Sequence, residues 1–255
     1  MRFDVLTLFP ELFAAHLQTG VTRRAFAPGG GVQVQLWPLR EYGEGGYRRV
    51  DDRPCGGGPG MVMCAEPLLR ALAAVRAARG QVPAAPVLYF SPGGRRLDQA
   101  LVRELAAGPG AVLLCGRYEG VDQRVIDTEV DLELSLGDYV LSGGELPALV
   151  LLDAVARLRP GVLGDERSPL DESFAEGDGL LEGPHYAPPE RLATRCGERA
   201  VPAVLLSGHH ARIARWRRER ALELSARRRP ELIARARAAG RLSAEDERFL
   251  ASLSL

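Results

Sequence analysis

Three glycine-containing loops hold the residues of this chain that could form a binding site. Glycine lets a backbone approach a ligand closely, so these loops predict binding by main-chain amides and carbonyls. Each loop alone is also explained as a turn that leads into a helix, with Arg117 and Glu119 as solvated charges. Three such loops in one chain favour a shared pocket. In chain order they are SPGGRRLDQ at 91–99, GRYEGVD at 116–122 and SLGDYVLSGGELP at 135–147.

A fourth glycine-rich segment, DDRPCGGGPGMVM at 51–63, looks like a phosphate-binding loop only superficially. It lacks both the GK[ST] ending and the GxGxxG spacing of nucleotide-binding loops. A turn whose glycines adopt positive φ explains the segment by itself. Because Asp51, Asp52 and Arg53 adjoin the glycines, a loop shaped to a ligand is the alternative.

The segments that must position these loops have the pattern of an α/β domain. PVLYF at 86–90 and AVLLC at 111–115 are continuous apolar runs, as expected for strands buried on both faces of a parallel sheet. FDVLTLF and VQVQLWPL are earlier β-rich runs, and Pro67 opens a helical pattern. Since ligands of open parallel sheets bind beyond the carboxyl ends of the strands, we expect the loops to line one pocket there.

The composition is that of a folded globular protein. Of 255 residues, 46% are hydrophobic and 26% charged, and the formal net charge is zero, so charge alone does not indicate a nucleic-acid partner. The four cysteines match no paired zinc motif, and we interpret them as structural. The amino terminus lacks the regions of a signal peptide, and no apolar run reaches the roughly 20 residues that span a bilayer, so a cytoplasmic location is expected.

The last third of the chain differs in composition. Residues 160–190 scatter five prolines among acidic residues and glycines, which predicts a linker. Beyond it, HARIARWRRERALEL predicts a helix with Ile213, Trp216 and Leu224 on one stripe and arginines on the other side. A solvated basic face is the simpler interpretation of that helix, and contact with RNA phosphates is the alternative. The arginines concerned are Arg212, Arg215 and Arg218.

Seven segments in a fixed order resemble the bacterial tRNA (guanine-N1)-methyltransferase family, TrmD, of the SPOUT superfamily. The resemblance covers nearly the whole chain. It implies an enzyme that transfers a methyl group from S-adenosylmethionine to N1 of guanine 37, next to the tRNA anticodon. The segments are FDVLTLFPELF, DDRPCGGGPGMVM, LCGRYEGVDQRV, LSLGDYVLSGGELPAL, DAVARLRPGVLG, GLLEGPHYAPPE and VPAVLLSGHHARIARWRRERAL.

The same resemblance implies a domain organisation and a quaternary structure. A SPOUT-type α/β catalytic domain with a parallel sheet and a deep trefoil knot is expected at 1–164. An interdomain linker at 165–190 would carry the base, and a small helical domain at 191–255 would bind tRNA. Family members act as homodimers in which the catalytic acid comes from the opposite subunit.

The resemblance also implies which residues hold the cofactor, S-adenosylmethionine. They lie on the three glycine-containing loops and act largely through main-chain groups. Mg²⁺ is a second candidate cofactor, with ligands that the sequence does not identify. The expected cofactor-binding residues are Tyr89, Ser91, Pro92, Gly116, Tyr118, Glu119, Gly120, Leu136, Gly137, Tyr139, Leu141, Gly143 and Gly144.

Methylation at N1 of guanine needs a base, because N1 carries a proton at neutral pH, and a cation to stabilise the negative charge that develops. By resemblance the cation is Arg157. The family pattern Glu-Asp-Ser-Phe supplies the base from its aspartate, but this chain reads Asp-Glu-Ser-Phe at 171–174. By position the base is therefore Glu172, with Asp171 as the alternative.

The residues expected to contact RNA are Ser207, His209, His210, Arg215 and Arg218. Two rival functions stay open at this point. One is a methyltransferase of the same fold that acts on another RNA or another atom. The other is a non-catalytic RNA-binding protein, which the inverted order of Asp171 and Glu172 makes conceivable.

Overall fold

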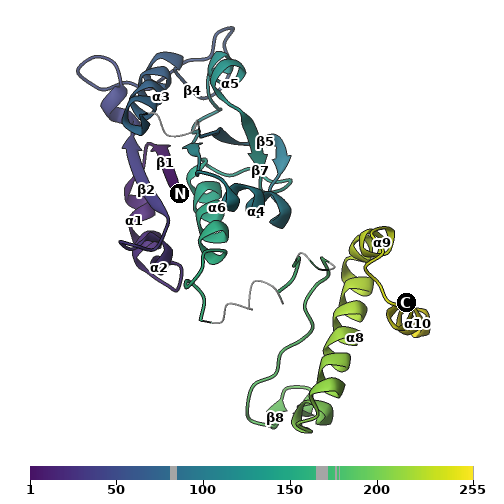
Figure 1. Ribbon diagram of the computed structural model, residues 1–255. Coiled ribbons are helices and arrows are strands. Elements are labelled where there is room, and N and C mark those ends of the chain that lie inside the picture. Colours follow the sequence, from purple (N-terminus) through teal and green to yellow (C-terminus); the bar gives the residue numbers. More distant parts are fainter. Residues whose placement is uncertain (81–84, 165–171, 176, 178, 255) are drawn as a thin grey trace. The chain divides into compact units, whose positions relative to one another are not determined.

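The computed structural model describes residues 1–80, 85–164, 172–175, 177 and 179–254 (Figure 1). The chain divides into two units, Met1–Glu166 and Arg167–Leu255, each with its own packing. Among the described residues, no helix combines the length and the apolar character needed to cross a membrane.

A five-stranded sheet forms the centre of the first unit, with strand order β2-β1-β6-β5-β7. Every pairing in it is parallel, which confirms the predicted α/β class. The two apolar runs predicted as doubly buried strands are buried from Val87 to Phe90 and from Val112 to Leu114. The strands are β1 (Arg2–Thr7), β2 (Gln33–Pro38), β5 (Val87–Arg96), β6 (Val112–Leu114) and β7 (Leu132–Ser135).

Helices cover both faces of this sheet. Because successive strand residues point to opposite faces, Leu88 and Phe90 pack with α1, α2, α4 and α6, whereas Val87 and Tyr89 pack with α3, α5 and η1. Each face thus has its own hydrophobic cluster. The helices are α1 (Glu11–Gln18), α2 (Arg23–Phe26), η1 (Leu39–Tyr42), α3 (Ala65–Arg79), α4 (Gln99–Ala107), α5 (Gln123–Glu129) and α6 (Glu145–Arg157).

Strand β5 is longer than the sequence predicts. Its pairing with β7 shifts between Phe90 and Arg95 and then continues to Arg96, so part of the expected loop at 91–99 is an irregular strand. Gly94 explains how the strand stays close to β7 there, because a Cβ at Gly94 would lie 2.4 Å from the backbone nitrogen of Leu134. The periodicity of an apolar run cannot reveal such a continuation through SPGG.

The glycine-rich run at 51–63 forms a short antiparallel hairpin of β3 (Asp51–Asp52) and β4 (Val62–Met63). Its tip has the left-handed backbone that favours glycine, as the turn interpretation predicts. The glycines with positive φ are Gly56, Gly57, Gly58 and Gly60.

The second unit consists of an exposed β-hairpin followed by helices. Leu180, from the segment expected to be a linker, is buried in the hydrophobic cluster of these helices with Leu222, Ile233 and Leu250. The hairpin is not visible in the sequence pattern, which predicts helices alone. The elements are β8 (Arg191–Thr194), β9 (Gly197–Ala200), η2 (Ala203–Leu206), α8 (His210–Arg228), α9 (Pro230–Ala238) and α10 (Ala244–Ser252).

Candidate functional site

The first unit contains a pocket at the carboxyl ends of β6 and β7 and beside the start of the register shift in β5, the edge at which open parallel sheets bind ligands. Its volume is about 210 Å³. The walls come from the three glycine-containing loops and from the first turn of α6, where Pro147 lies.

All thirteen residues that the sequence predicts as cofactor-binding line this pocket, although what they bind is still a prediction. Seven further residues line it and were not predicted. Most of these are neighbours of predicted residues, so the loops themselves were the signal that could have found them. The seven are Phe90, Arg117, Leu134, Ser135, Val140, Ser142 and Pro147.

Two of the pocket glycines are required by close packing. A Cβ at Gly116 would lie 2.7 Å from Cε2 of Tyr89, and a Cβ at Gly144 would lie 2.7 Å from the Cα of Cys115. The loops therefore approach each other through bare backbone, and Gly144 donates its amide hydrogen to the carbonyl of Gly116 at 2.9 Å. In the loop at 116–122, Tyr118 adopts a φ of +61°, a left-handed backbone conformation that is energetically costly for a residue with a large side chain.

The pocket is nearly neutral. Of its twenty lining residues only Arg117 and Glu119 are charged. Burial raises the pKa of Tyr89, and the nearby Glu133 raises it further. Burial and Asp51 likewise raise the pKa of Tyr118, so both phenols keep their protons at neutral pH. Such a site suits a ligand that is held by main-chain groups and apolar contact.

Arg117 is not the solvated charge that one interpretation of its loop allowed. Its side chain is 18% exposed and forms an ion pair with Glu145, the first residue of α6, whose side chain is 1% exposed. Glu119 does extend into solvent, and its side chain packs against Gly60 of the glycine-rich hairpin, where a Cβ would lie 2.3 Å from Oε1.

Arg157, the predicted catalytic residue of the first unit, is not among the residues that line the pocket. Arg157 is half-buried at the last position of α6, about 18 Å along the helix from the pocket end. Glu172 belongs to the second unit, where the residues after it are held by main-chain hydrogen bonds such as Phe174 N–H to the carbonyl of Leu180 at 2.9 Å. Asp171 lies outside the described residues.

The turn before α8 has the polar character that the sequence predicts. The Ser207 hydroxyl accepts a hydrogen bond from the His209 amide at 3.2 Å, and His209 and His210 are exposed where α8 begins. The His209 and His210 side chains of this turn are therefore accessible to a ligand.

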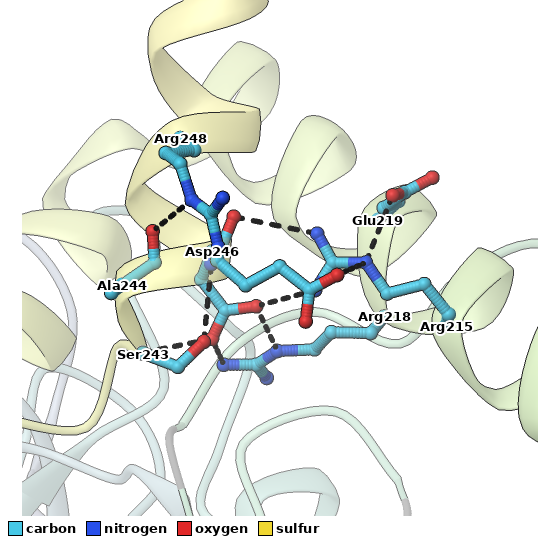
Figure 2. Close-up of polar contacts among 8 residues, drawn as sticks. Arg215, Arg218, Glu219, Ser243, Ala244, Asp246 and Arg248 are labelled. Carbon is cyan, nitrogen blue, oxygen red and sulfur yellow. Dashed lines mark hydrogen bonds and ion pairs between the residues drawn. The ribbon is translucent and has the colours of Figure 1, made fainter.

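The two arginines of α8 expected to contact RNA make contacts within the protein instead of pointing to solvent (Figure 2). Arg218 donates to both carboxylate oxygens of Asp246, at 3.1 and 3.3 Å, and Arg215 forms ion pairs with Glu219, Glu245 and Asp246. Asp246 is 4% exposed and caps α10 with Ser243. The expected division of α8 holds in part. Arg212 is exposed and the stripe of Ile213, Trp216 and Leu224 is half-buried, but the buried Leu222 shares a side with Arg215 and Arg218.

A metal site is not evident in the part of the chain that the structure describes. These residues contain no group of three or more histidine, cysteine, aspartate or glutamate side chains placed to hold a metal ion. We therefore assign no ligands for the Mg²⁺ that the resemblance suggested.

The parallel sheet and the glycine-lined pocket define the class of the protein, an α/β protein with a pocket where open parallel sheets bind small ligands. The family model described as tRNA (Guanine-1)-methyltransferase TrmD matches residues 1–235, and the chain belongs to this family.

Curated relatives match over full length. A tRNA (guanine-N(1)-)-methyltransferase of Leptothrix cholodnii is 66% identical over 255 residues, covering all of both chains. The proteins of the same name from Methylibium petroleiphilum and Bordetella pertussis are 64% and 58% identical. The match with the Methylibium protein covers 99% of this chain and 98% of that protein. The match with the Bordetella protein covers 100% of this chain and 98% of that protein.

Proposed function

We propose that this protein is a tRNA (guanine-N1)-methyltransferase that uses S-adenosylmethionine and acts on guanine 37. Membership of the TrmD family and the names of its full-length relatives support the reaction. The observation that carries the proposal is that thirteen residues expected to hold the cofactor lie around one pocket.

The chemistry of the pocket fits this cofactor. Leu136, Leu141 and Pro147 offer apolar contacts of the kind that an adenine ring needs, and Gly116 and Gly144 keep the loops that line the pocket close together through bare backbone. The bound cofactor would supply an activated methyl group together with its own leaving group. The task left to the protein is to position guanine and manage its proton.

In the proposed mechanism, the carboxylate of Glu172 removes the proton from N1 of guanine, and the guanidinium of Arg157 stabilises the charge that develops on N1 and O6. Asp171 is the alternative base. Arg157 is remote from the pocket of its own chain and Glu172 belongs to the other unit. The distance of Arg157 from that pocket supports a homodimer, and in this proposal the catalytic acid acts on the opposite subunit's pocket.

The finer architecture is part of the same proposal. We infer a deep trefoil knot at the carboxyl side of a catalytic domain at 1–164, a linker at 165–190 and a tRNA-binding domain at 191–255. The exposed turn at Ser207, His209 and His210 is the proposed phosphate contact of that domain. A cytoplasmic location follows from the substrate.

A methyl-transfer assay tests the function. Purified protein, radiolabelled S-adenosylmethionine and an unmodified tRNA transcript with guanine 37 should give 1-methylguanosine at that position, identified by nucleoside mass spectrometry. A transcript with adenine 37 should accept no label. Methylation of a different atom or nucleotide would favour the first rival, a methyltransferase of the same fold with another target. Binding of tRNA without methyl transfer would favour the second rival, a non-catalytic RNA-binding protein.

A further inference from the structure

Arg117 makes contacts with two other segments, the loop that leads into α6 and the loop after β1. Its Nε donates to Oε2 of Glu145 at 2.8 Å, and its Nη1 donates to the carbonyl oxygen of Ser142 at 3.1 Å. Its guanidinium carbon lies 4.4 Å from the ring centroid of Phe9, a cation–π distance. The loop after β6 is thereby joined to the loop before α6 and to the loop after β1.

Glu145 is the buried centre of this arrangement. The residue is 0% exposed, and its second oxygen, Oε1, accepts a hydrogen bond from the Thr7 hydroxyl at 2.8 Å. Thr7 Oγ1 in turn accepts the Phe9 amide hydrogen at 2.9 Å. A buried carboxylate needs a cation and hydrogen-bond donors to offset its lost hydration. Arg117 is the cation for Glu145, and the N-terminus of α6 adds a favourable dipole.

The same side chain passes close to Gly143, the first of the two glycines in the third loop. A Cβ at Gly143 would lie 2.3 Å from Nε and 2.4 Å from Cδ of Arg117. Arg117 therefore crosses the backbone at a position where any other residue would displace it. This contact explains why position 143 is a glycine, which a turn leading into a helix does not explain by itself.

We propose that Thr7, Glu145 and Arg117, here called the Thr7–Glu145–Arg117 chain, are positioning residues that fix the spacing of the pocket walls. They act on the ligand through the two loops that they join, at Gly116–Gly120 and at Ser142–Gly144. The inference rests on the proposed function, since it assigns the pocket to S-adenosylmethionine. The proposal adds three residues that determine the affinity for S-adenosylmethionine but take no part in the chemical step.

Binding of S-adenosylhomocysteine, measured by calorimetry, tests the proposal. Arg117→Met and Glu145→Gln should each weaken binding by about tenfold or more, the effect of losing a charge-assisted hydrogen bond. The variant with both substitutions should bind S-adenosylhomocysteine only slightly less tightly than the single variant with the lower affinity. The reason is that each substitution removes the same ion pair between Arg117 and Glu145. In methyl-transfer assays KM for S-adenosylmethionine should rise more than kcat falls.

Conservative and control variants separate positioning from a general loss of fold. Thr7→Val should weaken binding while Thr7→Ser, which keeps the hydroxyl, should restore it. Gly143→Ala should act in the same direction as Arg117→Met. Arg124→Met is the matched control, because Arg124 forms a surface ion pair with Asp122, two residues before it in the sequence. This variant should bind S-adenosylhomocysteine with wild-type affinity.

The outcomes decide between the two levels of inference. If the wild-type protein binds S-adenosylhomocysteine and the folded Arg117→Met and Thr7→Val variants bind it equally well, the positioning proposal is overturned and the proposed function stands. Additive losses in the double variant would also overturn it. If Arg117→Met does not fold, Thr7→Val against Thr7→Ser gives the decision. A wild-type protein that binds no S-adenosylhomocysteine would overturn both proposals.

Discussion

At the scale of single residues, the identity of the base is the sharpest question. The residues after Glu172 have a fixed local register, because the Ser173 hydroxyl accepts the Glu182 amide hydrogen at 2.9 Å and Phe174 is bonded to Leu180. A one-residue shift that would put Asp171 in the place of the family's base would break these contacts. Position therefore favours Glu172.

Glu172→Gln keeps the size of the side chain but removes its basic carboxylate. Single-turnover methyl transfer should fall by about 10²-fold or more, the range for a lost general base, while tRNA binding changes little. Asp171→Asn is the matched variant and should cost much less. The reverse pattern would assign the base to Asp171, and two nearly normal variants would exclude a carboxylate base.

The sequence predicted the pocket residues better than their mutual contacts. Glycine loops after buried strands indicate where ligands bind, and the resemblance to the TrmD family then names the thirteen cofactor positions, all of which line the pocket. Arg117 and Glu145 are 28 residues apart, and their ion pair depends on how two loops meet in space. In the sequence, Glu145 fits equally well as an exposed acid in the first turn of a helix, and nothing marks it as buried.

At the scale of elements, α8 shows why helical periodicity can mislead. A half-buried arginine that pairs with a buried acid occupies a core-facing position without being apolar. Burial alone would raise the pKa of Asp246, but hydrogen bonds from Arg218 and Ser243 outweigh it and lower the pKa. Asp246 therefore stays ionised at neutral pH and connects α10 to α8. The parallel strands were easier to predict, because burial on both faces leaves a continuous apolar run.

Two pairs of substitutions in α8 separate structural from RNA-binding arginines. Replacing Arg215 and Arg218 with glutamine should lower the melting temperature of the second unit by several degrees, because Asp246 loses its cations. Replacing the exposed Arg212 and Arg217 should leave melting unchanged. If α8 meets phosphates, that second pair should also reduce the salt dependence of tRNA binding by about one unit of slope per arginine.

Calorimetric melting and tRNA titrations at several salt concentrations measure these effects. Unchanged melting for the Arg215 and Arg218 variant would mean that the contacts with Asp246 contribute little to stability. If the salt dependence of tRNA binding falls only in the Arg215 and Arg218 variant, these two arginines are the ones that contact RNA.

At the scale of the whole molecule, the first unit exposes apolar side chains on elements that pack together. Phe9 just before α1, Leu12 in its first turn, and Leu146 and Val150 on α6 are between 36% and 52% exposed. Contacts between α1 and α6 place these elements side by side. Exposed apolar groups that gather on neighbouring elements are typical of an interface between protein chains. In the proposed homodimer, a second copy of the chain would cover these side chains.

Mixing two inactive variants tests whether one subunit completes the pocket of the other. Gly116→Val should block the pocket, since even a Cβ there would meet Tyr89, and Glu172→Gln should remove the base. If the base acts on the partner's pocket, each mixed dimer has one site with an intact pocket and an intact base. Co-expressed chains should then recover about a quarter of wild-type activity, because about half of randomly paired dimers are mixed.

Light scattering must give twice the 27.6 kDa mass of one chain for each preparation, so that assembly itself is controlled. Val150→Glu should lower that mass and the transfer rate together, because a charge at an apolar interface opposes association. Mixed dimers without recovered activity would place base and pocket in the same chain. A fully active monomer would exclude the dimer altogether, and Arg157 would then need to reach guanine within one chain, from the end of α6 opposite the pocket.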